Sequence, residues 1–173
     1  MTDRASQRPK AWLVCLMALA LAIAWPQASA FAQQGQPIVA AQTGLRTERL
    51  SIATPKGVRT FRVEIADTPR SREIGMMWRT QVPVGTGMLF NFKTPQQAYF
   101  WMENTLVGLD LIFIRSDGTI ANIAANATPL SRQAIPSNGN ILAVLEIGAG
   151  QAQKLGLAAG QVVRHPIFAG TKR

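Results

Sequence analysis

Two short apolar runs restrict the fold of this chain more than any other feature: Leu109–Ile114 and Ile141–Ile147. Each is almost uninterrupted, with Asp110 as the single polar residue of the first run and Glu146 as that of the second. Near-continuous apolar runs of this length are typical of strands that are covered on both faces. We therefore expect both runs to lie in the middle of a sheet.

Most other segments also have the pattern of strands. After a turn at Pro55–Gly57, the apolar residues Phe61, Val63 and Ile65 alternate with polar ones, which indicates a hairpin. A second hairpin turn is expected at Ser116–Thr119, because Asp-Gly readily takes positive φ. Further strands are expected at residues 87–92, 98–105, 120–125 and 162–168.

Only two helices are expected, and both are short. The first runs from Arg70 to about Arg79, with Asp67 or Thr68 as its cap, and the second is Gln151–Leu155. A chain of 173 residues corresponds to one domain. The expected fold class is therefore β-rich α+β: a single compact barrel- or sandwich-like domain of antiparallel or mixed strands with two short helices.

The first thirty residues have the pattern of an export signal. Basic residues in the first ten positions precede an uncharged apolar run at residues 11–25 and then the motif Ala28–Ala30. This order is typical of a secretory signal peptide, and the run is shorter than the ~20 residues that span a bilayer. We predict export to the periplasm or the medium, with no membrane span after cleavage before Phe31. The predicted divisions are a signal at 1–30, a flexible lead-in at 31–47 and one β-rich domain at 48–170.

Composition narrows the chemistry of the exported part. The only cysteine, Cys15, lies in the apolar run, so the chain from Phe31 onward has no disulfide, thiolate nucleophile or cysteine metal site. Three of the 18 basic residues and one of the nine acidic residues precede Phe31, which leaves a net charge of +7. The basic residues are spread singly, which favours a solvated surface near anionic envelope polymers and argues against nucleic acid as a partner.

Several motifs occur together in one order along the chain. They are Arg72-x-x-Gly75-Met76-Met77-x-Arg79, Gly87-Met88-Leu89-Phe90-x-Phe92, Phe100-Trp101-Met102-x-Asn104-Thr105, Leu109-Asp110, Ser116-Asp117-Gly118 and Val144-Leu145-Glu146. On these residues the chain resembles the bacterial and archaeal family called domain of unknown function 192, over residues 48–168. The resemblance implies a small, β-rich, often exported domain, and it implies no particular activity.

Residues 98–105 supply the first candidate site, a shallow pocket formed by Arg79, Trp101, Asn104 and Asp110. An aromatic face beside hydrogen-bonding groups suits a sugar ring, and these polar groups would converge if the first helix packs over this strand. The alternative is that Trp101 belongs to the core and that Asn104 and Asp110 only tie down loop backbone.

Three carboxylates form the second candidate: Glu103, Asp110 and Glu146. Two of them ~5–10 Å apart would permit glycoside hydrolysis, and burial could raise the pKa of one into the range of a general acid. The leading hypothesis is an envelope binding or accessory module without catalysis, for a saccharide or an anionic polymer. The alternative is a small hydrolase that acts on envelope polysaccharide through these carboxylates.

The remaining candidates have ordinary structural explanations. His165 is the only histidine, and with no nucleophile motif nearby we expect it to have a structural role. Thioethers can bind Cu(I), but the methionines after Phe31 lack Met-x-x-Met spacing and are expected to fill the core. No metal and no cofactor are therefore expected.

Overall fold

The structure is a computed structural model that describes residues 37–169, so the predicted signal and the first part of the lead-in lie outside the described residues. In this part of the chain, seven strands form one sheet. In spatial order they are β6 (Ile120–Ala127), β5 (Leu109–Ile114), β8 (Ile141–Gly148), β3 (Thr86–Gln96), β2 (Gly57–Ala66), β1 (Thr47–Thr54) and β9 (Val163–Arg164). A separate small sheet pairs β4 (Tyr99–Phe100) with β7 (Ile135–Pro136).

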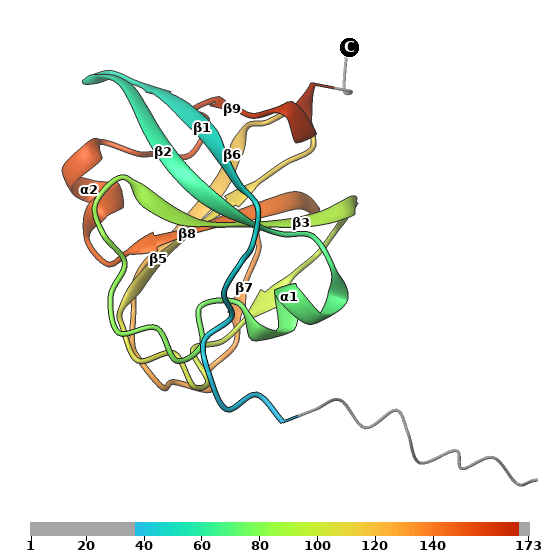
Figure 1. The fold of residues 1–173 in the computed structure, drawn as a ribbon. Helices are drawn as coiled ribbons and strands as arrows, with labels where there is room; N and C mark the ends of the chain where they lie inside the picture. The colour runs from blue at the N-terminus through green and yellow to red at the C-terminus, as the bar shows by residue number, and fades with distance from the viewer. Residues whose placement is uncertain (1–36, 170–173) are drawn as a thin grey trace, which may run out of the picture. The chain divides into compact units, whose positions relative to one another are not determined.

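The main sheet is mixed and curls until its two edges meet. Neighbouring strands are antiparallel except β2 and β3, which run parallel and are connected through α1 (Pro69–Ile74). At the edges, Thr119 before β6 bridges Val162 before β9, and the Val163 N–H donates to the Gly118 carbonyl at 2.8 Å. The result is a partly closed barrel (Figure 1). The expected β-rich α+β class with two short helices is confirmed.

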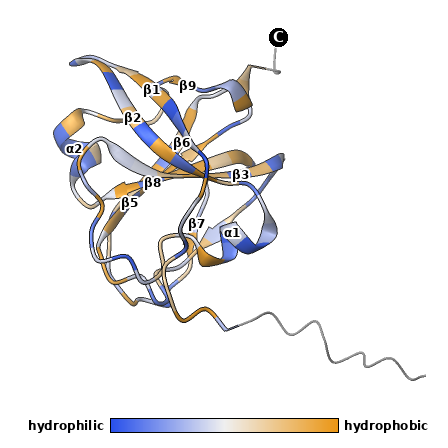
Figure 2. Ribbon diagram, viewed as in Figure 1, coloured by the Kyte–Doolittle hydropathy of each residue, from blue (hydrophilic) through white to orange (hydrophobic). Residues whose placement is uncertain are grey.

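Two hydrophobic clusters lie on opposite faces of this curled sheet. The first draws residues from all seven strands and from α2 (Gln151–Leu155), so it fills the barrel interior. The second gathers Met88, Phe90, Leu111, Phe113 and Val144 on the outer face of β3, β8 and β5. Every residue of β5 is buried, as are the first seven of β8, because these strands are covered on both sides. Figure 2 shows the apolar character of these strands, and the prediction from the two apolar runs is confirmed.

The first helix is shorter than expected. The Thr68 side chain accepts from the Ser71 N–H, which confirms Thr68 as the cap, but the helix ends at Ile74 and does not reach Arg79. Gly75 follows with φ 49°, and its N–H donates back to the Ser71 carbonyl. A Cβ at Gly75 would lie 3.0 Å from the Phe90 ring, so glycine also lets the chain pass close to that ring.

The second helix agrees with expectation, and the last strand does not. α2 ends before Gly156, which has φ 73°. β9 covers only Val163–Arg164, and a 3-10 helix, η1 (Pro166–Phe168), replaces the rest of the expected strand. Pro166 has no N–H for a sheet ladder, and its fixed φ suits the first position of a helix.

The expected strand at residues 98–105 is wrong beyond its first residues. β4 contains only Tyr99 and Phe100, and the chain then turns at Asn104, which has φ 55°. The Thr105 N–H donates to the Met102 carbonyl and closes this turn. Asparagine tolerates positive φ because its short polar side chain makes local hydrogen bonds. The alternation of exposed and buried residues therefore continues only as far as Met102.

Residues 37–46 have no regular secondary structure, but specific contacts attach them to the domain. The Gln42 side chain donates to the carbonyls of Ser71 and Gly75 at 3.0 and 2.9 Å. The Trp78 indole N–H donates to the Ile38 carbonyl at 3.0 Å. The sequence pattern of the lead-in did not predict these contacts. Among the described residues, no helix is long and apolar enough to cross a membrane.

Candidate functional site

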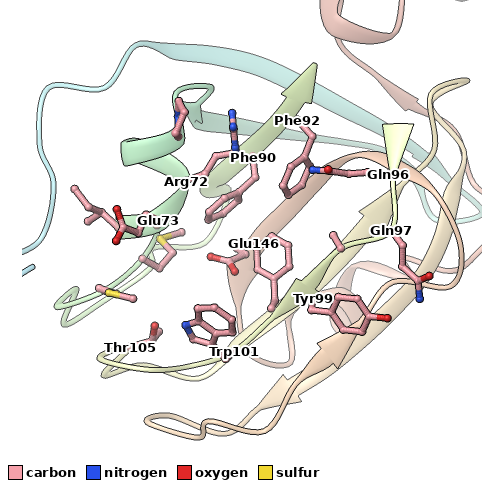
Figure 3. A pocket seen from close by; sticks show the side chains of 17 residues that line it. Arg72, Glu73, Phe90, Phe92, Gln96, Gln97, Tyr99, Trp101, Thr105 and Glu146 are labelled. Atoms are coloured by element: carbon pink, nitrogen blue, oxygen red, sulfur yellow. The ribbon is translucent and has the colours of Figure 1, made fainter. Parts of the chain in front are cut away.

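A pocket lies on the outer face of β3 and β8, between α1 and β4. Its volume is about 510 Å³, and Figure 3 shows the side chains that surround it. Helix α1 and the turn that follows it close one side, and the aromatic segment after Gln96 closes the other. The residues that line it are Pro69, Arg72, Glu73, Ile74, Gly75, Met76, Met77, Phe90, Phe92, Gln96, Gln97, Ala98, Tyr99, Phe100, Trp101, Thr105 and Glu146.

Glu146 reaches this pocket from the middle of β8. The register places it between Met88 of β3 and Leu111 of β5, both apolar. The residue is only 4% exposed, and its carboxyl has no hydrogen bond or ion pair with any described residue. Burial raises the pKa of Glu146 to about 8, since desolvation disfavours the charged form. Without a ligand, this carboxyl is therefore mostly protonated at neutral pH.

Aromatic rings form much of the wall. Phe100 packs edge-to-face on Phe90, with ring centroids 5.2 Å apart, and on Phe92 at 6.2 Å. Such contacts hold the rings in defined orientations. At the mouth, Tyr99 is 60% exposed and Trp101 is 52% exposed. The pocket thus combines a fixed aromatic wall with two rings that face solvent.

The two charged residues of α1 that line the pocket already have partners. The Arg72 guanidinium donates to the Asn91 carbonyl at 3.0 Å and lies 5.5 Å from the centroid of the Phe92 ring. The Glu73 carboxylate pairs with Arg70 at 3.0 Å near the surface. Both α1 residues therefore have partners within the described chain, and the buried carboxyl on the floor has none.

Asp110, a residue of both predicted sites, does not line this pocket. The register opposes Asp110 to Ile147 and Leu111 to Glu146, so Asp110 and Glu146 project from opposite faces of the sheet. Its carboxylate accepts three backbone N–H groups: Asn126 at 2.8 Å, Gly150 at 3.1 Å and Ala152 at 2.8 Å. These contacts fix the start of α2 and the end of β6, which agrees with the alternative that Asp110 ties down loop backbone.

Arg79 and Asn104 also lie away from the pocket. Arg79 pairs with Glu64 at 2.7 Å and borders a smaller cavity of about 200 Å³ near Pro83. The Asn104 amide lies 3.8 Å from the Met77 sulfur, and its backbone carbonyl accepts from the Trp78 N–H at 2.8 Å. Of the four residues predicted as a ligand site, only Trp101 lines the main pocket, and it is half exposed and not part of the core.

The three predicted acid–base residues do not converge. Glu103 pairs with Arg132 at 2.7 Å on the surface, Asp110 is bound by backbone donors, and Glu146 alone faces the pocket. A paired-carboxylate site of the kind that glycosidases use is therefore absent from the arrangement of these residues. Of these three acids, only Glu146 has no hydrogen bond or ion pair with a described residue.

His165 and three of the methionines lie in the interior of the domain. The His165 side chain is fully buried with its Nε2 3.0 Å from Glu48, and burial lowers the pKa of His165 despite the opposing effect of that carboxylate. Met76, Met88 and Met102 belong to the outer hydrophobic cluster. Within residues 37–169, no group of three or more His, Cys, Asp or Glu side chains is placed to hold a metal ion.

Sequence reasoning missed most of the pocket wall. Phe90, Phe92 and Phe100 had the appearance of core residues, and Arg72 that of a solvated helix face. One signal was available: a single carboxylate inside an otherwise apolar run must find a donor, a counter-ion or a cavity. The sequence did not distinguish Glu146 from Asp110 in this respect.

The fold places the chain among small β-rich α+β domains built on a partly closed barrel. The family model DUF192, described as an uncharacterized ACR, matches residues 51–165. The chain belongs to this family. A comparison with curated proteins finds no match.

Two solved structures are similar to this chain over almost their whole length. One, from Sinorhizobium meliloti 1021, is described as a "putative transcription regulator"; it is 38% identical, with a TM-score of 0.69, and the match covers 72% of this chain and 97% of that one. The other is a protein of unknown function from Novosphingobium aromaticivorans DSM 12444. It is also 38% identical, with a TM-score of 0.70, and the match covers 76% of this chain and 94% of that one.

Proposed function

We propose that the protein is an exported binding module of the cell envelope, without catalysis, whose ligand occupies the pocket between α1 and β4. The observation that carries the proposal is the unpartnered carboxyl of Glu146 on the floor of a 510 Å³ pocket. A buried polar group without a partner reduces stability, and a ligand that supplies the missing contact removes that cost. The pocket volume lies in the range of small-molecule sites.

The pocket suits a ligand with a ring or another flat apolar body. Tyr99 and Trp101 offer exposed ring faces at the mouth, on which a sugar or an aromatic ring can stack. A saccharide therefore stays among the ligands to be tested. An anionic polymer is less suited to this pocket, because Glu73 and Glu146 line it and the guanidinium of Arg72 is already engaged.

The hydrolase alternative has no geometric support. Hydrolysis with paired carboxylates needs both groups on one bond, and Asp110 lies on the other face of the sheet from Glu146. Glu103 is engaged with Arg132 at the surface. A single protonated carboxyl serves as a donor to a ligand without any second catalytic group.

A ligand screen with a matched pair of variants tests the binding function. We expect at least one class among oligosaccharides and small aromatic compounds to shift the NMR signals of pocket residues in the purified protein. Trp101→Ala should lower the affinity for that ligand about tenfold, because it removes a ring on which the ligand stacks. Val84→Ala removes a side chain that is 79% exposed and does not line the pocket, so it should have no effect. Shifts that map elsewhere, or equal affinity in Trp101→Ala, would contradict the proposal.

Export is tested independently of the ligand. Mass spectrometry of protein recovered from the periplasm or the medium should show Phe31 as the first residue. Recovery of an intact chain that still carries residues 1–30 would contradict cleavage and favour a retained anchor.

A further inference from the structure

We propose that the ligand of this pocket is a cation: a primary or secondary ammonium group on an apolar or aromatic body, with Glu146 as its counter-ion. The inference rests on the proposed binding function and names the ligand class for the same pocket. It depends on three features of the described residues: an acid without a partner, an arginine that is already engaged, and aromatic rings around the free space (Figure 3).

No basic side chain of the pocket neutralises Glu146. Arg72 is the one basic residue that lines the pocket, and β3 holds its guanidinium through the Asn91 carbonyl at 3.0 Å and the Phe92 ring at 5.5 Å. A buried carboxylate is stable only with an opposite charge or several donors close by. The chain supplies neither here, so a ligand cation provides the partner that the site lacks.

The walls of the pocket favour the same charge. Phe90, Phe100 and Trp101 line the pocket, and Figure 3 shows Glu146 between Phe90 and Trp101. The faces of aromatic rings carry negative potential and attract ammonium groups. A cation thus meets attractive rings along the wall and, once Glu146 has released its proton, a carboxylate at the floor. An anionic group has no such partner at the floor.

The other ionisable groups around the pocket do not replace the buried carboxyl. On α1, the Glu73 carboxylate pairs with Arg70, and its side chain is 59% exposed. On β4, the Tyr99 hydroxyl belongs to a side chain that faces solvent at the mouth. The neighbouring strands β3 and β5 present the apolar side chains Met88 and Leu111 next to the floor. One buried acid therefore decides the charge preference of the inner pocket.

Ligand binding and proton release are coupled at this site. Burial raises the pKa of Glu146 to about 8, so the carboxyl of the empty pocket is protonated at neutral pH. An ammonium group binds the ionised form, and the proton then leaves. Below that pKa the affinity for an amine should rise about tenfold per pH unit, and above it the affinity should level off. A neutral ligand of the same shape should show no such dependence.

Isothermal titration calorimetry with two matched probes tests this inference on the purified protein. We expect phenethylamine to bind with an affinity that rises about tenfold from about pH 6 to about pH 7, with release of about one proton. Phenethyl alcohol should bind at least about tenfold more weakly at neutral pH, and its affinity should not change with pH. Glu146→Gln should abolish the pH dependence and lower the affinity for the amine to that for the alcohol. Glu103→Gln removes a surface carboxyl that pairs with Arg132 and does not line the pocket, so it should retain the wild-type behaviour.

A second measurement needs no variant. The carboxyl carbon signal of Glu146 should titrate near the pKa of about 8 in the empty protein. Saturation with phenethylamine should lower that midpoint by about one pH unit or more, because the bound cation favours the carboxylate. An unchanged midpoint with the amine bound would overturn the assignment of Glu146 as counter-ion.

The outcomes separate this inference from the proposed function. Equal and pH-independent binding of the two probes overturns the cation and leaves the binding function in place. Binding of neutral sugars in the pocket, without binding of phenethylamine at millimolar concentration, also overturns the cation and leaves the binding function in place. Failure of every compound of the screen and of both probes removes the proposed function and the cation together.

Discussion

Asp110 and Glu146 lie on neighbouring strands, each as the single acid of an apolar run, and their surroundings are opposite. Asp110 accepts three backbone N–H groups within 3.1 Å, two of them at the start of α2. Glu146 projects from the other face of the sheet and has no partner among residues 37–169. The difference teaches that a buried acid is an anchor where the chain supplies donors and a site for a ligand where it does not.

Removal of the Asp110 carboxylate should have the largest effect on stability. Asp110→Ala leaves three backbone N–H groups, one buried and two part-buried, without their acceptor, so we expect a loss of about 3 kcal/mol in the free energy of unfolding. Urea denaturation followed by circular dichroism measures it. A loss below about 1 kcal/mol would break the comparison, because Asp110 would then contribute no more than an ordinary hydrogen bond.

Removal of the unpartnered acid should change the pH dependence of stability. The pKa of Glu146 rises from 4.5 to about 8 on folding, so the folded state binds more protons between these values. The contribution of the group is therefore fully present below pH 4.5 and is lost as the pH rises towards 8, by up to roughly 1.4 kcal/mol per pH unit.

Glu146→Gln has no group to titrate at this position, so its stability should fall less steeply over the same window. Urea midpoints of the two proteins, measured from about pH 5 to about pH 8, test this difference. Parallel profiles would show that the carboxyl is not desolvated in the folded protein. In that case the contrast with Asp110 would disappear.

The surface acid should have the smallest effect. Glu103 pairs with Arg132, whose side chain is 80% exposed, and exposed ion pairs contribute little. We expect Glu103→Gln to change the free energy of unfolding by less than about 0.5 kcal/mol. Thermal melts at low and high salt measure this. A loss as large as that of Asp110→Ala would contradict this expectation and show that Glu103 also stabilises the fold.

Local signals predicted much of the fold, and the errors have physical causes. The apolar runs, the turn at Pro55–Gly57 and the short helix before Gly156 depend on neighbouring residues, and each was confirmed. The first helix ended early because Gly75 takes positive φ against the Phe90 ring, a contact between distant parts of the chain. The strand expected at 98–105 stopped because the Asn104 carbonyl accepts from Trp78 and turns the chain there.

The candidate site was less predictable than the fold. Trp101 lines the pocket, but Arg79, Asn104 and Asp110, which were predicted to share a site with it, do not. Their partners, such as Glu64 for Arg79, come from segments that no sequence pattern links to them. The flexible lead-in, the signal and the export of the protein stay predictions.

The sequence by itself determined the class of fold, because alternation, apolar runs and turn residues act within a few positions of one another. It also determined that one acid would be buried in each central strand. Only the tertiary structure decided which acid is satisfied. In the pairing of β5 with β8, the two acids are offset by one position, so their side chains point to opposite faces of the sheet. Asp110 therefore meets the backbone donors of α2, and Glu146 meets an aromatic cavity. The donors and the cavity are formed by segments far apart in the sequence that meet only in the folded chain, so no local pattern encodes them.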